Sequence, residues 1–145
     1  MTREPGPVAK EAIAAAKELV ARGDTLAALE RYREAFEQLA RDGGHADGST
    51  VAHMAGTIDE DLATKLIWNV LALREADAET DRASVAWFYP SLHNNLAYSY
   101  AQLGDKDEAL AQLRQAWAHV GALEPGPYGD RVRAAIKQRL DELTR

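Results

Sequence analysis

The chain has no cysteine and no long apolar run, and both absences restrict its chemistry. Without cysteine in its 145 residues it can form no disulfide scaffold, thiolate metal site or cysteine nucleophile, which fits a reducing compartment. The longest apolar stretch, KLIWNVLALRE, is interrupted by Asn69 and falls far short of the roughly 20 residues of a membrane span. The first residues, MTREPGPVAKEAIAAAK, lack the apolar centre of a secretory signal. We therefore expect a cytoplasmic protein without a membrane segment.

An excess of positive charge is also missing. The chain has 23 acidic and 17 basic residues, and its net charge is −6. This balance repels phosphate backbones and makes sequence-independent binding of nucleic acid unfavourable. We expect no nucleic-acid partner.

The residues that are abundant favour helix throughout. Alanine, leucine, glutamate and arginine dominate, apolar positions recur at spacings of three and four, and no segment alternates as a strand does. A first helix is expected from about Val8 to Ala21, ending before Gly23, and a second from Thr25 to about Arg41 after a cap at Asp24 or Thr25. The glycine-rich RDGGHADGST is predicted to be a loop. The chain length fits one all-α domain.

The second half of the chain shows comparable signals. A short helix is expected near residues 50–55, followed by a capping box of Thr57 and Glu60 that starts the next helix. The polar stretch ADAETD predicts a loop, and Pro90 predicts a break within residues 82–103. A last helix is expected to end near Leu143.

Two segments 81 residues apart share one pattern. ARGDTLAALERYREAF and QLGDKDEALAQLRQAW superpose with glycine, aspartate, small and large residues at matching places: Gly23/Gly104, Asp24/Asp105, Ala28/Ala109, Leu29/Leu110, Tyr32/Leu113, Ala35/Ala116 and Phe36/Trp117. Glycine turns the chain, alanine allows two antiparallel helices to approach, and the larger residues fill the space beside them. The pattern predicts two copies of one helical hairpin.

The second copy resembles a tetratricopeptide repeat, a helix-turn-helix unit of about 34 residues. The signature positions are occupied by Leu96, Ala97, Tyr100, Gly104, Asp105, Ala109 and Ala116. The resemblance implies a short α-solenoid of about three helix pairs: repeat 1 at about 9–42, a degenerate repeat 2 at about 49–78, repeat 3 at about 83–121, and a capping helix at about 128–144. The chain is also similar to bacterial proteins of unassigned function in which YPSLH precedes a repeat.

The resemblance further implies a peptide-binding groove, because the first helix of each pair lines the concave side in that family. The positions that match are Lys10, Ile13, Lys17, Ser91, Asn94, Asn95, Tyr98 and Gln102. Amide side chains both donate and accept hydrogen bonds, which suits the main chain of a peptide. The predicted function is a protein- or peptide-binding interaction module. The alternative for the polar stripe is a hydrated helix face.

The aromatic run from Trp87 to Tyr89 admits two interpretations. Three consecutive residues span about 200° of a helix, so they either pack between helix pairs or leave one ring exposed as an anchor for a partner. The same run or the terminal helix could instead form a homodimer. His93 is expected to be a partly buried, hydrogen-bonded packing residue, although His53, Trp87 and His93 could line a regulatory small-molecule pocket.

No pattern indicates an enzyme, a metal or a cofactor. The loop GGHADGST has phosphate-loop glycine spacing, but Ser49 stands where lysine is needed and no strand precedes it. No two histidines have the i, i+4 spacing of a helical zinc site. Acidic residues such as Asp59 and Asp61 are explained by the preference of helix starts for negative charge.

Overall fold

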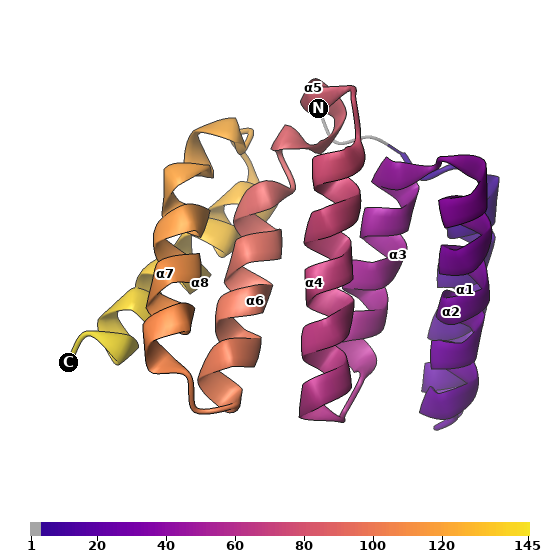
Figure 1. The fold of residues 1–145 in the computed structure, drawn as a ribbon, viewed down its shortest axis with the longest axis horizontal. Coiled ribbons are helices and arrows are strands. Elements are labelled where there is room, and N and C mark those ends of the chain that lie inside the picture. The colour runs from indigo at the N-terminus through magenta and orange to yellow at the C-terminus, as the bar shows by residue number, and fades with distance from the viewer. Residues whose placement is uncertain (1–3) are drawn as a thin grey trace. The chain divides into compact units, whose positions relative to one another are not determined.

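The computed structural model describes residues 4–145, and this part of the chain is helical without any strand. The elements are α1 (Pro7–Ala21), α2 (Thr25–Asp42), α3 (His45–Ile58), α4 (Leu62–Ala78), α5 (Arg82–Ala86), α6 (Tyr89–Gln102), α7 (Lys106–Ala118), the 3-10 turn η1 (Val120–Ala122) and α8 (Pro127–Leu143) (Figure 1). The all-α prediction is confirmed. Backbone contacts divide the described chain into two compact units, residues 4–80 and 81–145, and each is described by itself.

The unit of residues 4–80 consists of α1 to α4, and small residues let its helices approach closely. Alanines of α1 pack against Tyr32 and Leu39 of α2 and Val51 of α3 in one buried cluster. The start of α1 is tied to α3, because the backbone N–H of Gly6 donates to Oδ2 of Asp47 at 3.0 Å. Close packing of this kind is what alanine-rich helix faces permit.

Helix α3 overturns the predicted loop, because HADGST belongs to its first turns and only Gly43 and Gly44 connect it to α2. The glycines made this segment look irregular, since glycine disfavours helix by about 1 kcal/mol. Gly43 has the left-handed φ of 72° that ends α2, Gly48 faces the side chain of Glu75 on α4, and Gly56, later in α3, makes the closest approach to α4. A Cβ on Gly56 would lie 2.6 Å from Oδ1 of Asn69, and the Oγ of Ser49 donates to the carbonyl of Ala72 at 2.7 Å.

The predicted capping box was also wrong. Thr57 lies in the last turn of α3, where its Oγ1 donates to the carbonyl of Met54 at 2.7 Å. The cap of α4 is Asp61, whose Oδ2 accepts from the backbone N–H of Thr64 at 3.0 Å. An ionised carboxylate suits this place better than threonine because it meets the positive end of the helix dipole.

The unit of residues 81–145 contains the predicted break near Pro90, at a slightly earlier place. The chain turns at Trp87 and Phe88, and Pro90 lies in the first turn of α6. This position tolerates proline because the first helical N–H groups have no acceptor within the helix. Leu92 and Leu96 of α6 are buried, whereas Leu103 just after it is exposed.

Helix α8 packs on α6 and α7 through an apolar stripe. Ile136 is fully buried in a cluster with Ala97, Leu113 and Ala116, and Val132, Leu140 and Leu143 pack around it. This helix therefore covers apolar surface that the α6–α7 hairpin alone would leave exposed to water.

The glycine turns of the two predicted copies have equivalent backbone hydrogen bonds. The N–H of Asp24 donates to the carbonyl of Leu19 at 2.9 Å, and the N–H of Asp105 donates to that of Tyr100 at 2.9 Å. Both glycines are left-handed, with φ of 81° at position 23 and 86° at position 104. These are Schellman ends.

The start of the second helix is shared as well. Oδ1 of Asp24 accepts from the N–H of Ala27, and Oδ1 of Asp105 accepts from that of Glu108, each at 3.1 Å. Ala28 and Ala109, one turn later, are both 0% exposed. The equivalence predicted from the sequence therefore extends from hydrogen bonds to packing.

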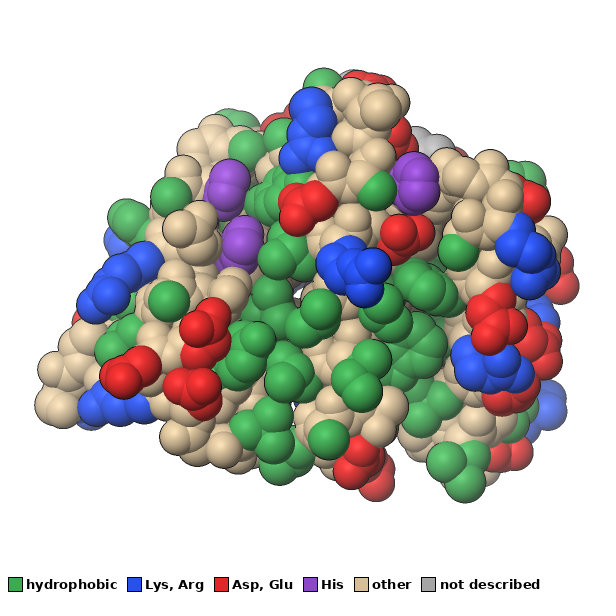
Figure 2. Space-filling model, in the orientation of Figure 1, with side chains coloured by type: hydrophobic (Ala, Val, Ile, Leu, Met, Phe, Trp, Pro, Cys, Tyr) green, Lys and Arg blue, Asp and Glu red, His purple; other side chains and the backbone are tan. Residues whose placement is uncertain are grey.

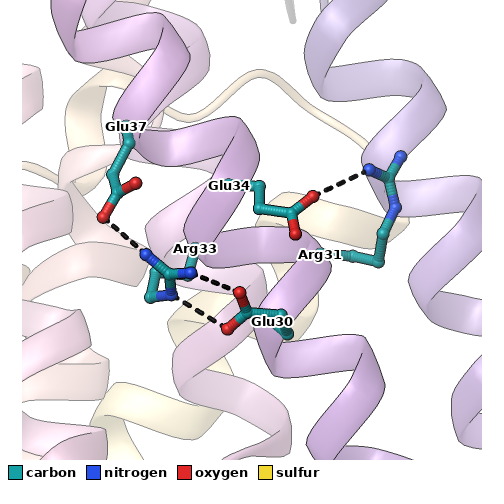
Figure 3. Close-up of polar contacts among 5 residues, drawn as sticks. All are labelled: Glu30, Arg31, Arg33, Glu34 and Glu37. Atoms are coloured by element: carbon teal, nitrogen blue, oxygen red, sulfur yellow. Dashed lines mark hydrogen bonds and ion pairs between the residues drawn. The ribbon is translucent and has the colours of Figure 1, made fainter.

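The exposed side of α2 carries ion pairs between neighbouring turns. Arg33 binds both Glu30 and Glu37, and NH1 of Arg31 lies 3.4 Å from Oε2 of Glu34 (Figure 3). These pairs are exposed to solvent and screened by salt, so they contribute little to stability compared with the buried face.

Candidate functional site

The α1 part of the predicted groove is cationic and open to solvent. Lys10 and Lys17 are exposed, and Nζ of Lys10 lies 3.9 Å from Oε2 of Glu4. Ile13 lies between them along the helix, but it is half-buried and packs against the core of residues 4–80. Of these three groove residues, the two lysines are the ones that a partner can reach.

The α6 part of the groove is partly covered by α8. The hydroxyl groups of Ser91 and Tyr128 share a hydrogen bond, and the guanidinium of Arg139 lies over the ring of Tyr98, 4.5 Å from its centroid. Burial lowers the pKa of Arg139. Gln102 is exposed at the end of α6. The stripe is therefore not a uniformly hydrated face.

Asn94 and Asn95 differ in burial although they are neighbours. Asn94 is 8% exposed, and its Oδ1 accepts no hydrogen bond from the described residues, whereas Asn95 is half-buried. A buried acceptor without a donor costs about 1–3 kcal/mol. Because this oxygen is buried, it is not an accessible binding group of the predicted groove.

The two parts of the groove belong to different compact units. Lys10, Ile13 and Lys17 lie on α1 in residues 4–80, and the other five lie on α6 in residues 81–145. The predicted pocket is divided in the same way, with His53 on α3 and Trp87 and His93 in the second unit. The α1 residues of the groove lie together on one helix, and so do its α6 residues. A single groove formed by both sets stays a prediction.

His53 lies on α3, half-buried. Burial lowers the pKa of its imidazole to about 4, because a charged ring loses hydration there. The side chain is therefore neutral at physiological pH.

His93 is buried and held by a chain of polar contacts, as the sequence predicted. Nε2 of Gln112 donates to Oε1 of Glu108 at 3.1 Å, and Oε1 of Gln112 lies 2.8 Å from Nδ1 of His93. A carboxylate only accepts, so it fixes the orientation of the amide. Nδ1 of His93 must then carry the proton, and a neutral ring carries its lone pair on Nε2.

A stack of rings surrounds His93, and the sequence analysis missed most of it. The rings of His93 and His119 are nearly parallel, with centroids 5.5 Å apart, and Tyr89 stacks on both at 6.1 and 5.2 Å. Arg82 lies over the Tyr89 ring at 5.3 Å. Figure 2 shows histidine side chains close together over α6 and α7. The i, i+4 spacing of Tyr89 and His93 was a usable signal, whereas no local pattern connects them to His119.

A cavity beside Trp87 was also missed. It has a volume of about 210 Å³ and lies between Trp87 and the segment from Leu123 to Gly129. The rings of Trp87 and Tyr128 meet edge to face, with centroids 5.8 Å apart, and Nε1 of Trp87 donates to the carbonyl of Ser84 at 2.9 Å. Of the three consecutive aromatics, Phe88 and Tyr89 are buried and Trp87 is half-buried.

Within residues 4–145, no three histidine or acidic side chains are placed to hold a metal ion. No helix in this range is long and apolar enough to cross a bilayer.

The sequence and the structure were also compared with known proteins. The chain matches no protein-family model, no curated protein and no solved structure.

Proposed function

We propose that this protein is an interaction module that binds extended peptide segments of a partner protein through the exposed face of α1 and that of α6. The observation that supports the proposal is the duplicated hairpin, whose two copies share the glycine turn, the aspartate cap and the buried alanine. Repeated helical hairpins of the tetratricopeptide type present their first helices to peptides, and α1 and α6 are the first helices of the two copies.

The chemistry of the two faces fits a peptide with acidic and main-chain groups. Lys10 and Lys17 supply positive charge on α1, and Gln102 supplies an amide on α6. The exposed amide of Gln102 can both donate to and accept from the main chain of a peptide. A carboxylate side chain of the peptide would pair with a lysine of α1, and its backbone would bind the amides of α6.

The experiment is a peptide selection followed by affinity measurements. Peptides are selected on the wild-type protein, and the best is titrated against Lys17→Glu, Gln102→Leu and the wild type by isothermal calorimetry. Each variant is expected to weaken binding about tenfold, which corresponds to the loss of one charged or buried hydrogen bond. The matched control is Lys106→Glu, which changes the charge equally at an exposed position of α7. Unchanged affinity in both groove variants would refute the proposed site.

The second candidate function is recognition of a small molecule in the cavity beside Trp87. Its volume of about 210 Å³ and its aromatic walls favour a compact ligand with an apolar face. Quenching or a spectral shift of tryptophan fluorescence during a metabolite screen, absent in Trp87→Leu, is the expected result. A screen that leaves both the fluorescence and the melting temperature unchanged would remove this candidate.

A further inference from the structure

An open groove lies at the end of the 4–80 unit where α2 and α4 begin. It has a volume of about 530 Å³, and the residues that form it include two leucines and four acids: Leu26, Leu29, Asp24, Asp59, Glu60 and Asp61. Figure 2 shows hydrophobic and acidic side chains together at this lower end of α2 and α4. The groove does not include any residue of the peptide-binding faces proposed above.

Leu26 is the residue of this groove that folding does not explain. Its side chain is 81% exposed, in the first turn of α2. The equivalent position of the second hairpin is Asp107, which is also exposed and lies in the first turn of α7. One hairpin template therefore accepts aspartate here, and aspartate is the better choice near a helix start. A leucine at this place is suited to contact with a partner.

The rim of the groove carries negative charge without a counterion. None of the four carboxylates pairs with a lysine or arginine of residues 4–145. Asp24 and Asp61 cap helices, and Oδ1 of the buried Asp59 accepts from the N–H of Asp61 at 3.0 Å. Capping fixes the positions of these acids, but it does not neutralise them. Glu60 is exposed and caps nothing.

We propose that this groove docks a basic segment of a partner protein, in which one apolar side chain is flanked by arginine or lysine. The apolar side chain would pack on Leu26 and Leu29, and the flanking cations would pair with the carboxylates of the rim. Apolar contact supplies the affinity, and charge complementarity selects the partner and its orientation. The inference does not rest on the proposed function, because the groove is separate and prefers the opposite charge.

The test is a titration of the ¹⁵N-labelled protein with two capped peptides, RRLRR and RRGRR, followed by NMR. RRLRR is expected to give saturable shifts at the amides of Leu26 and Glu60 and to bind about tenfold more tightly than RRGRR, the value for burial of one leucine. Leu26→Asp is expected to lose this advantage even though it adds negative charge. A purely electrostatic contact would instead become stronger in that variant.

Two control variants accompany the titration with RRLRR. Asp107→Ala changes the equivalent position of the other hairpin and should leave binding of RRLRR unchanged. Leu26→Asp should fold because the sister hairpin already carries aspartate there, and Leu26→Ser serves as a second variant if it does not. Three results would overturn the proposal: no saturable shift at millimolar peptide, equal binding by Leu26→Asp, or shifts at Leu26 caused by raising the protein concentration alone, which would identify a second copy as the occupant.

Discussion

At the scale of single residues, two glycines fix both hairpins of the repeat. Gly23 and Gly104 have φ near 80°, a conformation that costs other residues about 1–2 kcal/mol. A Cβ at either position would meet no atom within 4 Å. The need for glycine therefore comes from the backbone alone, which is why both turns could be located from the sequence.

We predict equal losses from alanine at the two turns. Gly23→Ala and Gly104→Ala should each lower the free energy of unfolding by about 1 kcal/mol, measured from urea denaturation midpoints. The control is Gly121→Ala, because Gly121 has no positive φ and an equally open surrounding. That control should be neutral. A loss at one turn only would contradict their equivalence.

His53 predicts a fall in stability on acidification. Its pKa is about 4 in the folded protein, against about 6.5 when unfolded, so between these values the unfolded state binds more protons. The free energy of unfolding should therefore decrease as the pH falls from about 6.5 to 4. The expected decrease is on the order of 2 kcal/mol for a half-buried ring. Urea midpoints measured across this range test the slope. His53→Gln should flatten it, and an unchanged slope would show that His53 is not the group responsible.

At the scale of elements, the sequence predicted the helices whose ends carry explicit signals. The hairpin turns, the break before α6 and the end of α8 were found because glycine, aspartate and proline act locally. The first turns of α3 were missed, although a short helix near residues 50–55 was expected, because Gly43, Gly44 and Gly48 stand close together in the sequence and glycine disfavours helix. Contacts that hold these turns to α4, such as that of Ser49 with Ala72, have no local sign. Tertiary packing here overrides intrinsic propensity.

Replacing the two glycines of α3 by alanine is expected to change the stability of the protein in different directions. Gly56→Ala should destabilise the protein by about 1–2 kcal/mol, because the new Cβ would lie 2.6 Å from Oδ1 of the buried Asn69. Gly48→Ala meets only the end of the flexible Glu75 side chain, so the better helix propensity of alanine should make it neutral or stabilising. Thermal melts of both variants decide, and equal effects would exclude close packing as the reason for Gly56.

For the α6 part of the candidate site, the sequence predicted only which residues share one face of the helix. The periodicity of α6 placed Ser91, Asn94, Tyr98 and Gln102 on one stripe, which is a local property. Their surroundings depend on α8, whose Tyr128 and Arg139 contact Ser91 and Tyr98. Contacts between elements distant in the chain leave no trace in helical spacing, so the coverage of the stripe could not be foreseen.

At the scale of the whole molecule, the distribution of charge is more informative than the net value. The chain carries −6, and its charges are unevenly placed: the exposed lysines of α1 are balanced by Glu11 and Glu18, whereas the groove beside Leu26 has four acids that pair with no lysine or arginine of residues 4–145. The protein should therefore distinguish partners by the location of their charges. Unfolding should respond little to salt, because the ion pairs of α2 are exposed.

Binding of RRLRR should in contrast depend strongly on salt. Raising sodium chloride from ~0.05 to ~0.5 M shortens the screening length severalfold and should weaken this complex severalfold. Calorimetric titrations at both salt concentrations measure the effect, with urea midpoints at the same concentrations as the control. A salt-independent affinity would mean that the carboxylates of the rim take no part.

The measurement that tests the central claim most directly is NMR mapping of the selected peptide on the ¹⁵N-labelled protein. The account predicts saturable shifts at both first helices, at residues including Lys10, Lys17, Tyr98 and Gln102, with α7 little affected. Shifts confined to other helices, or a protein that selects no peptide at all, would contradict it.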